Sequence, residues 1–227
     1  PFANIAHGCN SIIATKLALS LSDYVVTEAG FGSDLGAEKF LDIKCQEANL
    51  KPELCVVVAT IRALKLHGGA DENNLECEDL ESLKKGLPNL ERHLNNMKKF
   101  GLPTICNINI FSSDTKNELE LLENWLNEKG FKFALNDAYS KGAEGAIDIA
   151  KLAVETIDEN NSSFHPLYTK DMKLADKINL ICKEIYGAKN VIYSEKALAQ
   201  LNEYEEKYSD FYVCMAKTPL SFSDDPK

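Results

Sequence analysis

Hydrophobic and polar positions along the chain follow two spacings, and each spacing predicts one kind of element. Apolar side chains that recur every three or four residues indicate amphipathic helices, and short continuous apolar or β-branched runs indicate strands. The predicted helices cover residues 10–22, 36–47, 80–100, 115–129, 144–158, 175–186 and 195–208. The predicted strands cover residues 24–27, 54–61, 104–111, 131–135, 191–193 and 211–215.

Local features refine these predictions. Residues 54–61 form a continuous apolar run, which is typical of a strand buried on both faces of a parallel sheet. Gly86 and Pro88 are expected to interrupt the helix over 80–100, because proline lacks the N–H that a helix interior requires. Asp114 is expected to cap the helix over 115–129, and Gly130 to end it.

The order of these elements predicts the fold class and the domains. Strand and helix alternate as far as about residue 158, which favours an α/β fold with a mostly parallel sheet and helices on both faces. The polar run 160–166 is typical of a boundary. We therefore expect residues 1–160 to be part of one α/β domain and residues 161–227 to be a smaller α/β element that is incomplete at its C-terminal end.

Composition narrows the class of protein. The chain has 227 residues, 44% of them apolar, and a net charge of −10. The apolar fraction is typical of an ordinary globular protein. The negative net charge argues against a nucleic-acid binder, which normally has a basic face. The seven cysteines are scattered without a Cys-x-x-Cys pair, so we expect buried thiols in a reducing cytoplasm. No apolar stretch is long enough to cross a membrane, and no leader indicates export.

The chemistry is expected just beyond the carboxyl ends of the strands, where open parallel sheets bind ligands. After residues 24–27 comes a glycine-rich loop with Gly30, Gly32 and Gly36. Its amides can approach a phosphate, although by itself the pattern favours a structural tight turn. Glu28 and Asp34 can hold magnesium, or Asp34 can cap the following helix.

Two other strand ends carry polar and aromatic side chains. Asn109 offers both a donor and an acceptor and can read a nucleobase edge, or it can bond loop backbone. Phe111 and Tyr139 can sandwich a flat heterocycle, or they can pack in the core. The four histidines have no metal-ligand spacing, and no Ser-His-Asp order or G-x-S-x-G elbow supports a hydrolase.

Longer stretches of sequence resemble one family across the whole chain. The chain is similar to formate–tetrahydrofolate ligase in Pro1–Ser11, Thr27–Phe40, Val58–Lys65, His67–Gly69, Val213–Thr218 and Ser221–Pro226. The resemblance implies a P-loop NTPase-like α/β fold and an ATP-driven ligation. Formate would attack the γ-phosphate of magnesium-ATP, and the amine of tetrahydrofolate would then attack the formyl carbon of formyl phosphate. A monovalent cation and a homotetramer are implied as well.

The resemblance also assigns roles to residues. Phe111 and Tyr139 match the aromatic pair that stacks on the pterin, and the family usually has Trp where this chain has Tyr139. Asn109 would face the adenine. The residues assigned to the nucleotide phosphates are Gly30, Gly32, Ser33, Asp34, Gly36, Lys39 and Arg62. A Gly32→Val change is expected to harm nucleotide binding, partly by penalising a positive φ.

The family's P-loop lysine and its arginine segment have no counterpart in these residues. We expect both before Pro1, together with the catalytic residues, and a further segment after Lys227. The chain is therefore expected to be a fragment that does not turn over alone. A non-catalytic binding module or degenerate paralogue is the alternative. A GTPase is weakened because Asn109–Phe111 lacks the Asp of a guanine-reading motif.

Overall fold

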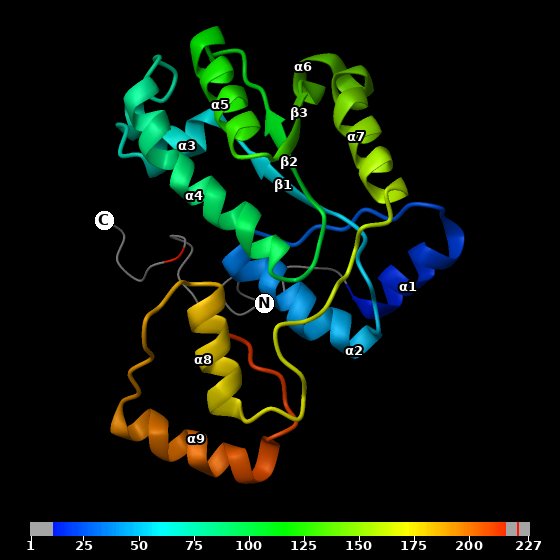
Figure 1. Cartoon of the computed structure of the whole chain (residues 1–227), viewed down its shortest axis with the longest axis vertical. Helices are drawn as coiled ribbons and strands as arrows, with labels where there is room; N and C mark the ends of the chain where they lie inside the picture. Colours follow the sequence, from blue (N-terminus) through cyan, green and yellow to red (C-terminus); the bar gives the residue numbers. More distant parts are fainter. Residues whose placement is uncertain (1–10, 217–221, 223–227) are drawn as a thin grey trace. The chain divides into compact units, whose positions relative to one another are not determined.

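The structure is a computed structural model that describes residues 11–216 and Phe222 (Figure 1). The chain forms two compact units, which are described separately. One is continuous, Pro52–Phe164, and the other combines Pro1–Lys51 with His165–Lys227. These units are groups of residues in close contact, and they do not test the expected domain boundary at residue 160, which stays a prediction.

A parallel sheet forms the centre of the continuous unit. Its strands are β1 (Cys55–Ala59), β2 (Thr104–Asn109) and β3 (Lys132–Asn136), in the order β1-β2-β3. Val57 lies opposite Cys106, and Cys106 lies opposite Phe133. All three strands therefore run in the same direction, and their carboxyl ends lie at one edge.

Helices cover both faces of this sheet (Figure 1). The core joins the strands to α3 (Ile61–His67), α4 (Leu80–Lys98) and α5 (Lys116–Glu128). On the other face, α7 (Ile147–Asp158) packs along β3. Short helical segments span Glu72–Asn74, Ala138–Lys141 (α6) and Gly142–Ala146. The predicted α/β class with a parallel sheet is confirmed.

The expectation that residues 54–61 are buried on both faces is wrong for β1. Val56 is 40% exposed and Val58 is 57% exposed. Both lie on the face that α7 covers over β3, because Val58 is in register with Asn107 and Ala134. β1 is the edge strand of the described sheet, so α7 does not reach these valines.

The expected break in the helix over 80–100 is also wrong, because α4 runs through Gly86 and Pro88. Pro88 lies on the exposed side of the helix, where water can satisfy the carbonyl that loses its N–H partner. Gly86 lies against α3, and a Cβ there would be 1.9 Å from the carbonyl oxygen of Leu64. The glycine therefore allows α3 and α4 to pack closely.

The second unit is built mainly from helices in its described part. These are α1 (Ile12–Leu21), α8 (Leu174–Glu184), α9 (Glu195–Tyr208) and a helix of consecutive segments Ser33–Ala37, Phe40–Cys45 and Gln46–Ala48 (α2). The first two of these segments have the wider turns of a π-helix. We call the whole stretch the 33–48 helix.

The strands predicted at 24–27, 191–193 and 211–215 do not form. In the described residues these segments are extended or irregular, and no strand pairs with them. Val26 is 96% exposed and Ile192 is 95% exposed. Residue 213 instead exchanges hydrogen bonds with the buried Tyr168 hydroxyl. The predicted α/β element at this end is therefore helical where it is described.

A buried lysine holds the segments before α8 and after α9 against α8. Lys177 on α8 donates to the backbone carbonyls of Lys170, Ser209 and Phe211, at 2.8 to 2.9 Å. Burial lowers the pKa of Lys177. Three carbonyl acceptors replace the water that the ammonium loses, and so fix the segment after α9 against α8.

Candidate functional site

The carboxyl edge of the sheet gathers polar and aromatic residues from three strand ends. Arg62 lies in the first turn of α3 after β1, Phe111 follows β2, and Tyr139 lies on α6 after β3. The parallel register places Asn109 opposite Asn136 at this edge. The fold thus brings together the three strand ends that the sequence selected within this unit.

Arg62 and Phe111 are in direct contact. The guanidinium carbon of Arg62 lies 4.8 Å from the centre of the Phe111 ring. The Nη2 atom of Arg62 donates to Ser113 Oγ at 2.9 Å and to Glu76 Oε1 at 3.1 Å. In the described chain, Arg62 therefore binds a ring, a hydroxyl and a carboxylate.

Asp114 does not cap the following helix, contrary to the sequence-based expectation. Thr115 caps α5, and its hydroxyl and the Glu118 carboxylate form a reciprocal capping box. Asp114 Oδ2 instead accepts the Phe111 backbone N–H at 2.9 Å. The Asp114 N–H donates to the Phe111 carbonyl at 3.0 Å, which closes a tight turn. Burial raises the pKa of Asp114.

Asparagines organise the same edge. Asn107 Nδ2 donates to Asn109 Oδ1 at 3.1 Å, so the Asn109 carbonyl oxygen already has a partner. Asn136 Oδ1 accepts the Ala138 N–H at 2.9 Å and so fixes the start of the turn that carries Tyr139. The Asn107 Oδ1 atom is buried and has no hydrogen-bond partner among the described residues. Sequence reasoning placed Asn107 at this strand end but gave it no role, because a strand sequence gives no local signal for an unpaired side-chain atom.

Tyr139 is 94% exposed. Core packing therefore does not explain this aromatic residue in the described chain. Phe111 is partly buried, and none of the ring contacts of the described residues joins it to Tyr139. Whether the two rings form one slot stays a prediction.

The glycine loop belongs to the other unit. The Gly36 N–H donates to the Gly30 carbonyl at 3.0 Å, and a Cβ at Gly36 would lie 2.2 Å from that oxygen. Only glycine fits there. Gly32 has φ −88°, whereas Phe31 has φ +66°. The expected positive φ at Gly32 is therefore wrong, since the strained position is the neighbouring phenylalanine.

The helix after this loop carries a line of buried acids four residues apart. Asp34, Glu38 and Asp42 are at most 1% exposed. Burial and then the charge of Asp42 raise the pKa of Glu38. Burial likewise raises the pKa of Asp42, although the Leu167 N–H donates to its Oδ1 at 2.7 Å. Lys39 is fully buried beside these acids.

Sequence analysis missed Glu38 and Asp42 as site residues. The available signal was that Asp34, Glu38 and Asp42 are four residues apart, which places them on one face of a helix. The other predicted magnesium ligand, Glu28, is exposed. Among residues 11–216 and Phe222, no three His, Cys, Asp or Glu side chains gather as a metal site.

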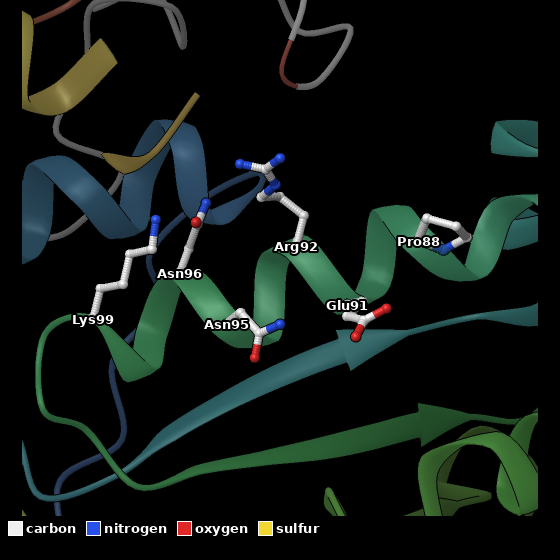
Figure 2. Close-up of a pocket in the computed structure, with 6 residues that line it drawn as sticks. All are labelled: Pro88, Glu91, Arg92, Asn95, Asn96 and Lys99. Atoms are coloured by element: carbon white, nitrogen blue, oxygen red, sulfur yellow. The ribbon is translucent and has the colours of Figure 1, made fainter. Parts of the chain in front are cut away.

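A separate pocket lies on α4. Its volume is about 370 Å³, and Figure 2 shows its lining residues Pro88, Glu91, Arg92, Asn95, Asn96 and Lys99. α4 ends at Lys98 and β2 begins at Thr104. The pocket is therefore near the amino ends of the strands, away from Arg62 and Phe111.

Comparisons with known proteins identify the family. A family model described as formate–tetrahydrofolate ligase matches residues 1–227. The chain belongs to the formate–tetrahydrofolate ligase family. It is 54% identical over 226 residues to the formate–tetrahydrofolate ligases of Staphylococcus aureus strains NCTC 8325, MSSA476 and Newman. These alignments cover 99% of this chain and 40% of each relative.

The chain thus spans less than half the length of these ligases. The described helices include none that is long and apolar enough to cross a membrane. Cys45, Cys55, Cys77, Cys106, Cys182 and Cys214 are free thiols in the described chain.

Proposed function

We propose that these residues are part of a longer enzyme that joins formate to tetrahydrofolate at the expense of ATP. The products are 10-formyltetrahydrofolate, ADP and phosphate. Family membership carries this proposal, through 54% identity over almost the whole chain. We place the enzyme in the cytoplasm because its cysteines are scattered and free in the described chain. Its assembly as a homo-oligomer, expected as a tetramer, is part of the same proposal.

The reaction passes through formyl phosphate. Formate is a poor acyl donor because its oxygen is a poor leaving group, and phosphorylation supplies a better one. Attack by the tetrahydrofolate amine on the formyl carbon then releases phosphate. Positioning and neutralisation of charge supply most of the catalysis in phosphoryl transfer. The groups that act on the γ-phosphate would lie in the remainder of the enzyme.

The carboxyl edge of the sheet is the proposed folate side. Phe111 is held by its backbone and presents an aromatic ring, and Tyr139 is free of core packing. These two residues would stack on the pterin, and Asn109 would contact the adenine. Stacked aromatic contacts add about 0.5–1.5 kcal/mol to the area they bury.

The glycine loop is the proposed phosphate side. Gly30, Gly32 and Ser33 would present backbone amides at the start of the 33–48 helix, where the helix dipole favours an anion. Gly36 would shape the loop for the phosphates through its N–H bond to the Gly30 carbonyl. Lys39 is buried with Glu38, so we assign it to charge balance inside the unit rather than to direct phosphate contact.

Magnesium would arrive with ATP. This ion is commonly bound by one or two carboxylates together with substrate phosphates and waters. Glu28, which is exposed beside the glycine loop, would be one such carboxylate, and Asp34, which is buried at the start of the 33–48 helix, would be the other. A monovalent cation is proposed as an activator without assigned ligands.

The test is product formation by the complete protein that contains this sequence. We expect 10-formyltetrahydrofolate and ADP only when ATP, formate and tetrahydrofolate are all present. Binding of ATP and tetrahydrofolate without any product would favour the alternative, a binding module that has lost turnover.

A further inference from the structure

The Phe111 ring is held from two directions. Its backbone N–H and carbonyl are both bonded to Asp114, so the main chain of the turn is closed. Its ring contacts the Arg62 guanidinium, whose carbon lies 4.8 Å from the ring centre. The two attachments come from different strand ends, one from the first turn of α3 after β1 and the other from the loop after β2. The ring orientation is thus set by tertiary structure.

Arg62 is itself fixed before any ligand arrives. Nη2 donates to Ser113 Oγ and Glu76 Oε1 at 2.9 and 3.1 Å, and the side chain is only 34% exposed. The Nε atom is buried and has no hydrogen-bond partner among the described residues. The guanidinium is therefore held by Nη2 and by the ring, with its charge already opposed by Glu76.

A phenyl ring has two faces, and the guanidinium covers one of them. A flat ligand can therefore stack only on the other face. We propose that Arg62 is a positioning residue for tetrahydrofolate, which holds Phe111 with one face open. The proposal rests on the proposed function, and it replaces the expected contact of Arg62 with the nucleotide.

The chemistry of arginine suits this task better than that of lysine. The planar guanidinium can stack on a ring while its edge donates hydrogen bonds to Ser113 and Glu76. An ammonium keeps the charge but has no plane to lie on the ring. Arg62→Lys should therefore keep part of the effect, and Arg62→Met should lose it.

The experiment is steady-state kinetics of the complete enzyme, with ATP, formate and tetrahydrofolate varied in turn. Arg62→Met should raise the KM for tetrahydrofolate about tenfold, and Arg62→Lys should raise it about threefold. The KM for ATP should change less than about twofold in both. The matched control is Arg92→Met, the same change at an arginine on α4 near the amino ends of the strands.

A double-mutant cycle separates positioning from a general structural role. In a Phe111→Leu background, Arg62→Met should have almost no further effect on the KM for tetrahydrofolate, because the ring through which it acts is gone. Additive effects would overturn the proposal, as would a rise in the KM for ATP without one for tetrahydrofolate. A wild-type enzyme that makes no product overturns the proposed function, whereas an active enzyme indifferent to Arg62→Met overturns only this inference.

Discussion

At the scale of single residues, Glu38 and Asp42 are a pair of buried carboxylic acids in the unit that contains the glycine loop. Both are fully buried in the 33–48 helix, four residues apart. Neither Glu38 oxygen accepts a hydrogen bond from a donor of the described residues. Two adjacent carboxyl groups can bond to each other only when one carries a proton. Burial and this proximity raise the pKa of Glu38.

The pH dependence of stability should reveal this pair. A folded-state pKa above the unfolded one means that the folded protein binds more protons between the two values, so its stability falls as pH rises from about 4.5 upward. Glu38→Gln removes this titration. The free energy of unfolding of the variant, minus that of wild type, should increase as pH rises, by up to about 1.4 kcal/mol per pH unit.

Urea unfolding of both proteins between about pH 4.5 and 8 measures this difference. Glu47→Gln is the control on the same helix, because a hydrogen bond from Lys170 lowers the pKa of Glu47 instead. A difference between Glu38→Gln and wild type that does not change with pH would contradict the raised pKa of Glu38.

Tyr139 gives a second prediction at this scale. Tyr139→Ala should raise the KM for tetrahydrofolate about tenfold, since loss of a stacked ring costs about 1.4 kcal/mol. The KM for ATP should change little. Because the side chain is 94% exposed, its loss should also leave the melting temperature unchanged.

Tyr139→Trp is the matched variant. It should be tolerated and should tighten tetrahydrofolate binding, because the larger ring restores stacking area. Separate titrations of ATP and tetrahydrofolate measure both variants, and equal losses for the two ligands in Tyr139→Ala would contradict the slot.

At the scale of elements, close packing of α3 on α4 depends on glycine. A Cβ at Gly86 would lie 1.9 Å from the Leu64 carbonyl oxygen, and one at Gly68 would lie 1.7 Å from the Ser82 carbonyl oxygen. The two helices therefore pack backbone to backbone. A buried ion pair joins the same region to α5, with 2.8 Å between Lys65 Nζ and Glu118 Oε1.

Gly86→Ala should destabilise the protein. Alanine improves intrinsic helix stability by about 1 kcal/mol, but the overlap with α3 forces a backbone shift. We expect a net loss of about 1–3 kcal/mol, measured by urea unfolding. Lys85→Ala, at the exposed neighbouring position, should be nearly neutral. A Gly86→Ala variant as stable as wild type would mean that α3 moves without cost.

At the scale of the whole molecule, one unit is continuous in sequence and the other is not. Residues 52–164 form the sheet and its helices, whereas the second unit joins both ends of the chain. The bond from the Leu167 N–H to Asp42, at 2.7 Å, is one of the contacts that close this second unit. The glycine loop and the carboxyl edge of the sheet thus belong to different units.

The share of the relatives that this chain covers predicts how activity depends on the length of the protein. The aligned relatives extend far beyond this chain, which covers 40% of their length. The purified 227 residues should make no 10-formyltetrahydrofolate, whereas the complete protein should, under identical substrate concentrations. Normal turnover by the 227 residues would contradict the claim that essential groups lie elsewhere. Retained binding of tetrahydrofolate by the 227 residues, measured by calorimetry, would show that the carboxyl edge is formed within them.

The sequence by itself determined the longer helices, the three strands of the sheet and the family. The helical spacing of residues 115–129 and the glycine at 130 predicted α5 and its end, and Gly130 has the expected positive φ of 70°. These features were readable because they depend on residues within a few turns of each other. The long matched stretches predicted the family in the same way.

Only the tertiary structure decided which side chains meet. Residues 24–27 have strand composition but no partner strand in the described chain, since pairing depends on distant residues. Asp114 is a residue type that often caps helices. It instead accepts a hydrogen bond from the Phe111 N–H, because Thr115 caps α5 together with Glu118. Arg62 and Phe111 are far apart in the sequence, with most of α3 and all of α4 between them. Parallel pairing of β1 and β2 places their carboxyl ends side by side, and this pairing brings the guanidinium into contact with the ring. A contact between strand ends has no local signal, because its energy depends on groups that meet only after the sheet has formed.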